Sequence, residues 1–545
     1  MKNIVLIGFM GTGKSEVGKR LAGDLGWSFE DTDLWIEERE GRTIPEIFRR
    51  SGEARFRRRE KEVVAELAKR ESSVIATGGG AVMDPVNLRN LRRNGVLISL
   101  SASPDAIMAR TAGSDRPLLQ EGHRLHKIQE LLESRRPYYL LSDHRIDTTH
   151  RNPRQIVTMI KNIVSVTAPI RVDLEDRSYS IEIGSRTLPK IGERLVSLGL
   201  KGKVAVVTNP RVGRLYGPTV IRSLRKAGFD LVTVTLPDGE RFKNLESVSR
   251  VYDELIRKSF ERSSTVLALG GGVIGDLAGF AAATFMRGVG FVQVPTTLAA
   301  QVDASIGGKT GVDHPKGKNL IGAFYQPKWV FIDPEVLRTL SRREFVSGLA
   351  EVIKYGVIRD EEFFSYLEDN MDKILKQEPA ALTHAIRRSC AIKAEVIQKD
   401  EREGGLRKTL NYGHTFGHAL ETITNYRTYL HGEAVSIGMA FATHLSVRLG
   451  FSDASTARRQ IELLKRAGLP VALPKIRTAD MLKTMTLDKK VADGRIHFVL
   501  AERIGRVTVK PVQEKQIAGL LKASTKSEPP ALPGRARGVG ASGDL

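Results

Sequence analysis

Cysteine is the scarcest residue of this sequence, with a single copy, Cys390, among 545 residues. One cysteine excludes an intrachain disulfide framework and a cysteine-rich zinc site, and its scarcity favours a reducing compartment. Any metal ion must therefore be held by histidine and carboxylate side chains. No uninterrupted apolar run approaches the roughly 18 residues of a membrane-spanning helix, and nothing suggests export. We expect a cytoplasmic protein without a membrane partner.

Aromatic residues are also few, at 6% of the chain, whereas the formal net charge is +22. The excess of basic residues is spread along the sequence. The one dense run, RFRRRE at 55–60, lies in a helical pattern with acidic residues on both sides, which favours a solvated helix face. We therefore expect basic clefts for anionic small molecules and no nucleic-acid partner, with nucleic-acid binding as the weaker alternative.

Apolar strand patterns alternate with amphipathic helical patterns over the first two thirds of the chain, as in NIVLIGF, VIATGG, KVAVVTN and TVLALGGG. This alternation predicts two α/β units with parallel sheets. From about residue 345 the strand signal fades and long helical periodicities follow, which predicts an all-helical region. A tail rich in Pro, Gly and Ser is expected to be disordered. The predicted boundaries are 1–166, 167–344, 345–523 and 524–545.

The segment GFMGTGKS, residues 8–15, matches the pattern G-x-x-x-x-G-K-S at a predicted strand-to-helix turn. In such a loop, backbone N–H groups surround phosphate oxygens, the lysine reaches the β- and γ-phosphates, and the serine hydroxyl holds Mg²⁺. We therefore expect a nucleotide with Mg²⁺ to bind through Gly11, Gly13, Lys14 and Ser15.

Three further features point to the acceptor of the phosphoryl group. Asp33 lies in the acidic segment DTD after the second predicted strand, Arg57 lies on a predicted helix, and Gly79 and Gly80 follow the strand pattern VIAT. An acidic residue can take a proton from an acceptor hydroxyl, and an arginine fork can hold a carboxylate with two hydrogen bonds. Bare backbone at the glycines allows a ring to approach closely.

With these motifs, and with RPLL and R-x-P-x-Y further on, residues 1–166 resemble shikimate kinase. The resemblance implies a P-loop kinase fold, a parallel sheet with helices on both faces, and phosphorylation of shikimate by ATP. It implies catalytic roles for Lys14 and Asp33, and contacts to ATP or shikimate by Ser15, Arg116, Arg57, Gly79, Gly80 and Arg135. A nucleotide-binding regulatory module without kinase activity is the alternative, which the intact Asp33, Arg57 and Arg135 disfavour.

In the second unit, a G-x-G-x-x-G pattern begins at Gly270, between a predicted strand and a predicted helix. The pattern alone is a weak dinucleotide signal, because the acidic residue expected about 20 positions later for the ribose is missing. An ordinary Rossmann domain is therefore disfavoured. Asp276, Glu240 and Lys243 offer different polar contacts for a cofactor. Downstream, a span predicted to be rich in loops gathers residues able to bind an anion or a hydroxyl of a phosphorylated substrate, namely Asp303, Lys309, Lys318 and Asn319.

Two histidines, His414 and His418, stand four apart in the helical pattern NYGHTFGHALE, so they share a helix face. The glutamate that follows the first histidine in a zinc protease is replaced by Thr415. Glu351, His414 and His431 together supply a carboxylate and two imidazoles and leave an open position, as catalytic zinc requires. His418 is then available for acid–base chemistry or substrate binding.

The strings GGGVIGDLAGF, PTTLAAQVDASIGGKT, GKNLIGAF, GLAEVIKYG, LNYGHTFGHALE and LHGEA make residues 168–523 resemble 3-dehydroquinate synthase. The resemblance implies NAD- and metal-dependent conversion of 3-deoxy-arabino-heptulosonate 7-phosphate to 3-dehydroquinate with release of phosphate. The metal, Zn²⁺ or Co²⁺, would be bound by Glu351, His414 and His431. NAD would be contacted by Glu240, Lys243, Gly271, Gly272, Asp276, Thr296 and Thr297. The implied substrate contacts are Asp303, Lys309, Lys318, Asn319, Lys354, Lys393, Arg407, Asn411, His418 and either Lys489 or Lys490. Catalytic roles would fall to Lys309, Lys354, Arg407, Asn411 and His418.

The whole chain is thus predicted to be a bifunctional shikimate-pathway enzyme. Its expected partners are the small molecules shikimate, ATP and the heptulosonate phosphate, together with a second copy of the chain bound through the synthase-like unit. For the second unit, another sugar-phosphate cyclase or an NAD- and metal-dependent polyol dehydrogenase stays open as an alternative. The cluster of Lys309, Lys318 and Asn319 disfavours a simple polyol substrate.

Overall fold

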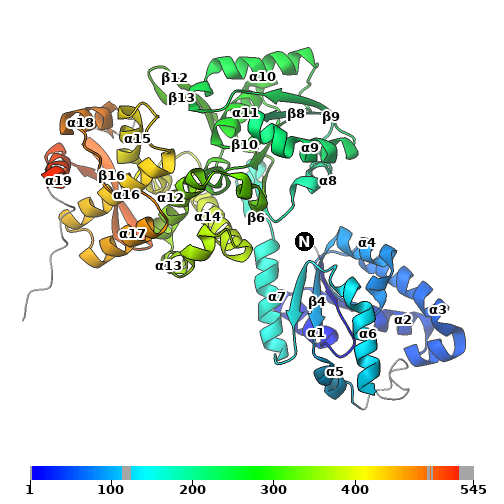
Figure 1. Ribbon diagram of the computed structural model, residues 1–545. Coiled ribbons are helices and arrows are strands. Elements are labelled where there is room, and N and C mark those ends of the chain that lie inside the picture. The colour runs from blue at the N-terminus through cyan, green and yellow to red at the C-terminus, as the bar shows by residue number, and fades with distance from the viewer. Residues whose placement is uncertain (1–2, 113–123, 488–490, 493–494, 527–545) are drawn as a thin grey trace, which may run out of the picture. The chain divides into compact units, whose positions relative to one another are not determined.

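The computed structural model describes residues 3–112, 124–487, 491–492 and 495–526. The chain divides into two compact units, Met1–Ala168 and Pro169–Leu545 (Figure 1). Within the described residues, no helix combines the length and the apolar character that a bilayer crossing requires. The predicted disordered tail falls mostly outside the described residues, of which the last belong to helix α19 (Glu514–Lys526).

The first unit is built on a five-stranded parallel sheet with the order β2-β3-β1-β4-β5. These strands are β1 (Asn3–Ile7), β2 (Ser28–Asp31), β3 (Ser73–Ala76), β4 (Gly95–Ser101) and β5 (His144–Asp147). The helices are α1 (Lys14–Leu25), α2 (Thr32–Glu40), α3 (Ile44–Leu67), η1 (Ala81–Met83), α4 (Pro85–Arg93), α5 (Pro104–Arg110), α6 (Arg124–Tyr139) and α7 (Pro153–Thr167).

The central strand β1 is buried along its whole length, and its side chains alternate between two cores. Ile4 and Leu6 pack with α1 and α7 on one face of the sheet. Val5 and Ile7 pack with α2, α3 and α4 on the other face. The predicted parallel sheet with helices on both faces is therefore confirmed for this unit.

The second unit begins with a seven-stranded sheet of order β6-β7-β14-β11-β10-β8-β9, in which only β6 runs antiparallel to its neighbour. Its strands are β6 (Ile170–Val172), β7 (Tyr179–Ile183), β8 (Lys203–Thr208), β9 (Asp230–Thr235), β10 (Thr265–Gly270), β11 (Gly290–Pro295) and β14 (Trp329–Ile332). One face is covered by α8 (Ile191–Ser197) and α9 (Pro210–Lys226). The other face is covered by α10 (Leu245–Arg257) and α11 (Gly272–Thr284).

The span predicted to be rich in loops, 295–319, is more regular than expected. It contains a π-helical turn, η7 (Ala300–Ala304), and most of an antiparallel hairpin formed by β12 (Lys309–His314) and β13 (Gly317–Phe324). Short helical turns complete this part of the unit, namely η3 (Glu175–Arg177), η4 (Leu188–Lys190), η5 (Glu240–Phe242), η6 (Phe285–Arg287) and η8 (Pro334–Thr339).

The remainder of the second unit is mainly helical, as predicted, but it is not all helical. The helices are α12 (Arg342–Arg359), α13 (Glu361–Leu375), α14 (Pro379–Lys399), η9 (Leu406–Asn411), α15 (His414–Ile423), α16 (His431–Arg448), α17 (Ala454–Arg466), α18 (Thr478–Leu487) and α19. A three-stranded antiparallel sheet was missed, and it comprises β15 (Val491–Ala492), β16 (Arg495–Arg503) and β17 (Arg506–Val512).

Candidate active sites

The phosphate-binding loop of the first unit joins β1 to the first turn of α1. Gly13 precedes the helix with a φ of 91°, in the left-handed region that glycine adopts most easily. The Lys14 ammonium donates to the carbonyl oxygens of Gly8 and Phe9, at 2.9 Å each. The Ser15 hydroxyl donates to the Asp31 carboxylate at 2.6 Å. The N-terminus of α1, the Lys14 ammonium and the side-chain oxygens of Ser15 and Asp31 thus lie together, as a nucleotide phosphate with Mg²⁺ requires.

The glycines after β3 lie against two arginines predicted to bind the acceptor. A Cβ atom added at Gly80 would lie 2.8 Å from the guanidinium nitrogens of Arg57. A Cβ atom added at Gly79 would lie 3.5 Å from Nη1 of Arg135. The Tyr139 hydroxyl donates to the carbonyl oxygen of Gly79 at 2.6 Å, which fixes this backbone. The four residues predicted from the sequence are therefore brought together.

Asp33 lies beside the same glycine segment, because a Cβ atom added at Gly78 would be 2.7 Å from its Oδ1. This oxygen is buried and accepts no hydrogen bond from the described residues. Burial raises the pKa of Asp33 to about 6, and the negative charge of Asp31 adds to the effect. A carboxylate with a buried oxygen and a pKa near neutrality is suited to accept a proton from a hydroxyl group.

Glu60 is a member of this site that the sequence analysis missed. It lies in the basic run at 55–60 that was expected to form a solvated face, yet its side chain is buried and pairs with Arg57 at 2.8 Å. Burial raises the pKa of Glu60 against the opposing effect of Arg57. The spacing of three residues on one helix was the available signal, since it places both side chains on the same face.

The predicted metal triad comes from three helices of the second unit, with Glu351 on α12, His414 at the start of α15 and His431 at the start of α16. Oε1 of Glu351 lies 3.3 Å from Nε2 of His414 and 3.5 Å from Nε2 of His431. The three ligand atoms all lie within 4.8 Å of one another. Oε1 of Glu351 is buried and accepts no hydrogen bond from the described residues, although Lys354 forms an ion pair with the same carboxylate.

Close backbone contacts fix the helices that carry these ligands. A Cβ atom added at Gly432, next to His431, would lie 1.8 Å from the carbonyl oxygen of Ser347 on α12. A Cβ atom added at Gly438 would lie 1.9 Å from the carbonyl oxygen of Gly413, which precedes α15. Helix α16 thus touches both of the other ligand-bearing segments through bare backbone.

Each histidine of the triad also has a contact at its other ring nitrogen. Nδ1 of His414 lies 3.1 Å from the carbonyl oxygen of Tyr412, and Nδ1 of His431 lies 3.3 Å from Oε2 of Glu421. A carbonyl oxygen can only accept, so Nδ1 of His414 carries the proton and Nε2 keeps its lone pair for a metal ion. The donor set and the orphaned carboxylate oxygen therefore fit a metal ion with two imidazole ligands and one carboxylate ligand.

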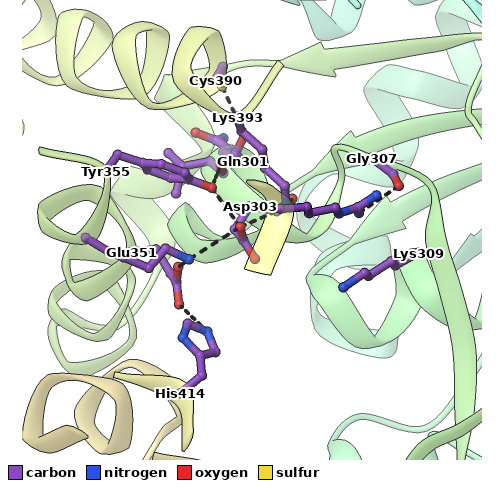
Figure 2. Close-up of polar contacts among 12 residues, drawn as sticks. Gln301, Asp303, Gly307, Lys309, Glu351, Tyr355, Cys390, Lys393 and His414 are labelled. Carbon is purple, nitrogen blue, oxygen red and sulfur yellow. Dashed lines mark hydrogen bonds and ion pairs between the residues drawn. The ribbon is translucent and has the colours of Figure 1, made fainter. Parts of the chain in front are cut away.

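A buried group of charges adjoins the triad, centred on Asp303 in η7 (Figure 2). Its carboxylate accepts from Lys393 at 2.8 Å and from the Tyr355 hydroxyl at 2.7 Å, and Lys354 lies 3.8 Å away. Burial alone would raise the pKa of Asp303, but Lys393 and Lys354 outweigh it and lower the pKa. Burial, with repulsion from Arg407, lowers the pKa of Lys393 to about 8.

Glu403 is a second residue that the sequence analysis missed. Its carboxylate accepts from Lys309 at 2.6 Å and from the Asn411 amide at 2.7 Å, so it joins two predicted substrate contacts. Close by in the chain, the buried Arg407 donates to the carbonyl oxygen of Gly307 at 2.9 Å. Glu403 lies in a short connection rich in charges, where no periodicity marked it out.

The residues predicted to contact NAD fall into two neighbouring groups. Lys243 pairs with Asp276 at 2.6 Å and donates to Oδ1 of Asn319 at 2.6 Å, and Lys318 pairs with Glu240 at 3.0 Å. Residues predicted to contact the cofactor therefore bind directly to residues predicted to contact the substrate.

The second group lies at the N-terminus of α11. The N–H of Thr296 donates to the carbonyl oxygen of Gly270 at 2.9 Å. A Cβ atom added at Gly271 would lie 3.1 Å from the Thr297 methyl group, and one added at Gly272 would lie 3.3 Å from Ala304. These glycines allow a close approach to a helix N-terminus, which suits a pyrophosphate.

Three predicted contacts, Arg116, Lys489 and Lys490, lie outside the described residues. His418 lies next to the triad, with its ring centroid 5.3 Å from that of His414 and 5.9 Å from that of His431. The remaining predicted residues of the second unit gather around the triad, the Asp303 group and the α11 N-terminus.

The two sites define a P-loop phosphotransferase unit and a metal-binding unit with a glycine-rich nucleotide-type turn. Comparisons with known proteins agree. Residues 10–165 match the family described as shikimate kinase. Residues 233–347 match the N-terminal part and residues 348–491 the C-terminal part of 3-dehydroquinate synthase.

Curated relatives are similar over nearly their full length. The 3-dehydroquinate synthase of Geotalea uraniireducens is 51% identical over 345 residues, which are 63% of this chain and 96% of that protein. The 3-dehydroquinate synthase of a Picosynechococcus species is 52% identical and is covered to 94%, by 63% of this chain. A solved structure of 2-epi-5-epi-valiolone synthase from Streptomyces hygroscopicus, with NAD⁺ and Zn²⁺ bound, is 29% identical with a TM-score of 0.60 and matches 65% of this chain and 98% of that one.

The chain belongs to the 3-dehydroquinate synthase family, and it carries a shikimate kinase domain in the same polypeptide. It is therefore a bifunctional enzyme of the shikimate pathway, a transferase and a lyase, as predicted. The predicted fold class is confirmed as well, apart from the small C-terminal sheet.

Proposed function

We propose that the first unit phosphorylates shikimate with Asp33 as the group that takes the proton from the acceptor hydroxyl. Lys14 and Ser15 would bind the ATP phosphates and Mg²⁺, and Arg57 and Arg135 would bind the shikimate carboxylate over the bare backbone of Gly79 and Gly80. The observation that carries this proposal is the buried, unpaired Oδ1 of Asp33 beside the glycine segment. Arg116 is proposed as a further ATP contact.

The assignment of Arg57 can be tested by kinetics. Replacing Arg57 by Ala should chiefly raise the KM for shikimate, because a charged hydrogen bond to a carboxylate contributes about 1.5–3 kcal/mol. Glu53 pairs with Arg57 from an exposed position, so Glu53→Gln is a matched control that should change KM little. An effect of Arg57→Ala on the KM for ATP alone would contradict the assignment.

For the second unit, we propose that Glu351, His414 and His431 hold the metal ion, Zn²⁺ or Co²⁺. NAD would bind at the N-terminus of α11 and against Glu240, Lys243, Asp276, Thr296 and Thr297. When bound, NAD⁺ can take up and return a hydride, and the metal ion makes a substrate hydroxyl more acidic. The carrying observation is the buried carboxylate oxygen of Glu351, which lies near two imidazole nitrogens and accepts no hydrogen bond from the part of the chain that the structure describes.

The remaining residues would bind and orient the heptulosonate phosphate. Lys309, Arg407 and Asn411 supply a cationic and amide surface for its anionic groups, to which Lys318, Asn319 and one of Lys489 and Lys490 would add. Asp303 would orient Lys393 and Lys354 toward the substrate. Glu403 lies between Lys309 and Asn411, so a substrate anion that binds these groups would free the Glu403 carboxylate to accept a proton. His418 would serve as a second acid–base group.

Phosphate release from 3-deoxy-arabino-heptulosonate 7-phosphate tests the second unit. With NAD⁺ present, release should stop after chelation, return with Zn²⁺ and leave no net NADH. Glu351→Gln should remove it, whereas Glu368→Gln, which breaks a carboxylate pair with Arg459 away from the triad, should not. Kinase activity of the same preparation controls for folding. Accumulation of NADH without phosphate release would instead support a polyol dehydrogenase.

We further propose that the chain forms a homodimer through the second unit and works in the cytoplasm. Among the described residues, β13 pairs only with β12, so its other edge is available to a second chain. Leu320 and Phe324 on this strand are exposed apolar residues. Light scattering of the wild-type chain and of a Leu320→Lys variant tests the dimer, which the charge should weaken. Cytoplasmic location is supported by the single, buried cysteine.

A further inference from the structure

Glu421 is a buried carboxylate to which neither the sequence nor the proposed reaction assigns a role. Its side chain is 5% exposed, and its two oxygens have different partners. Oε2 lies 3.3 Å from Nδ1 of His431, and Oε1 lies 3.5 Å from Nζ of Lys318. The carboxylate thus contacts the far side of a metal ligand and, at the same time, a lysine of the β12–β13 hairpin.

Lys318 extends this chain of contacts to the cofactor side of the unit. Its ammonium lies 3.0 Å from Oε1 of Glu240, which is one of the residues proposed to contact NAD. It also lies 4.2 Å from the centroid of the Tyr426 ring, and this cation–π contact further restricts its position. A row of four side chains, in which acidic and basic groups alternate and each contacts the next, therefore joins the two sites: Glu240, Lys318, Glu421 and His431.

The four residues of this row come from four separate elements, namely η5, β13, α15 and α16. A carboxylate that accepts a hydrogen bond from a ligating histidine fixes the ring orientation and makes the other nitrogen a better ligand. Lys318 in turn restrains Glu421. A change in the position of Lys318 therefore reaches His431 through a single intervening side chain.

We propose that Glu421 is a positioning residue for the metal ligand His431, and that the Lys318–Glu421 pair couples the affinity of the metal site to that of the NAD site. This inference rests on the proposed function, because it takes Glu351, His414 and His431 as the metal ligands. Coupling between two sites is reciprocal, so NAD⁺ would tighten the metal site by the same factor by which the metal tightens NAD⁺ binding.

Zinc affinity of the metal-free full chain, measured by competition with a chromophoric chelator, tests the positioning role without using activity. Glu421→Gln should weaken zinc binding about 10–100-fold, which is the usual cost of losing a partner of a ligating histidine. Glu368→Gln, with a carboxylate-to-amide change elsewhere in the helical part, should leave the affinity unchanged. Wild-type affinity in a folded Glu421→Gln chain would overturn the inference.

The same titration with and without saturating NAD⁺ tests the coupling. The wild-type chain should bind zinc at least about fivefold more tightly with NAD⁺, in the range usual for coupled sites. Lys318→Met should bring this factor close to one, because it breaks the link from Glu240 to Glu421 while Glu421 still contacts His431. Glu240→Gln offers an independent variant with the same expected loss. A wild-type factor of one would overturn the coupling.

Two further outcomes separate this inference from the proposed function. His418, Glu421 and His431 also bring ligand atoms within 4.8 Å of one another. Binding of two zinc ions per chain would overturn the positioning role, because Glu421 would then be a ligand itself. Unchanged zinc binding by Glu351→Gln would refute the proposed metal site, whereas failure of Glu421→Gln alone would leave that site standing.

Discussion

Asp33 in the first unit and Asp303 in the second are both partly buried carboxylates, yet their pKa values move in opposite directions. Burial acts to raise both. Around Asp33 the acidic Asp31 adds to burial, and its pKa reaches about 6. Around Asp303 two ammonium groups, those of Lys393 and Lys354, outweigh burial and keep the carboxylate charged. The neighbours of a partly buried carboxylate therefore decide whether it can exchange a proton or serves as a fixed charge.

This difference matches the task proposed for each unit. A single proton must leave the acceptor hydroxyl in the first unit, and Asp33 holds an unpaired oxygen for it. The second unit must hold an anionic substrate in place, and Asp303 fixes two lysines at their positions. Four experiments, in order of decreasing expected effect, test this comparison.

The largest effect is expected for Asp33→Asn, which removes the proposed proton acceptor. The kcat for shikimate-dependent ADP formation should fall about 10²–10⁴-fold, because general-base catalysis contributes that much. Nucleotide binding, measured by fluorescence titration, should persist, and phosphate release by the second unit serves as the internal control. Unchanged turnover of the Asp33→Asn variant would contradict the proposal that Asp33 is the proton acceptor.

The next effect concerns stability. Lys393→Met leaves the partly buried Asp303 with one cation fewer, and breaking such an ion pair costs at most about 3 kcal/mol, reduced by removal of the unfavourably buried Lys393 ammonium. Hydrogen exchange of peptides from α14 in increasing urea should report the loss. The double variant Asp303→Asn, Lys393→Met removes both charges, so it should recover a large part of the stability lost in Lys393→Met. A double variant less stable than Lys393→Met would contradict the ion-pair account.

A smaller effect is expected from pH. The pKa of Lys393 is lowered from 10.5 to about 8, so its charge is lost above pH 8 in the folded chain. The kcat/KM of the synthase reaction should then fall about tenfold per pH unit above pH 8, while Lys393→Arg, which stays charged, should shift the fall upward.

Stability distinguishes this loss of charge from unfolding. Between about pH 8 and 10.5 the unfolded chain binds more protons at Lys393 than the folded chain does. The contribution of this lysine to the free energy of unfolding therefore rises with pH in that window. A parallel fall of synthase activity and of hydrogen-exchange protection in α14 would indicate unfolding and contradict the assignment.

The smallest effect is expected for Tyr139→Phe in the first unit. The change removes the hydrogen bond to the Gly79 carbonyl and costs about 1 kcal/mol, which corresponds to about a fivefold rise in the KM for shikimate. Steady-state kinetics at saturating ATP measure it. Tyr138→Phe, one residue earlier on the same helix, is the matched control and should leave KM unchanged.

The sequence predicted the first site more completely than the second. Gly11 to Ser15 form one contiguous motif whose residue types allow little else at a strand-to-helix turn, so its geometry could be read locally. Glu60 was missed because a run of arginines hid its buried position. In the second unit, the metal triad could be predicted from ligand chemistry, although its members come from three helices.

The contacts of the second site that depend on distant segments could not be read from the sequence. The pair of Lys318 with Glu421 joins a hairpin to a helix 103 positions further along the chain, and no local spacing specifies it. The small sheet had a usable signal, which was overlooked among the helices. In β16, Ile496, Phe498 and Leu500 alternate toward the core, and Gly505 turns the chain with a φ of 80°.

The bare backbone at Gly432 and Gly438 has a consequence for how sequences of this kind can vary. Any side chain there would push α16 away from Ser347 or Gly413 and carry His431 with it. In a library that samples all amino acids at every position, these two sites should tolerate no replacement, although neither glycine supplies a ligand atom of the metal triad. The helix placement that the metal ion requires would thus restrict which amino acids can occur at positions that do not touch the ion.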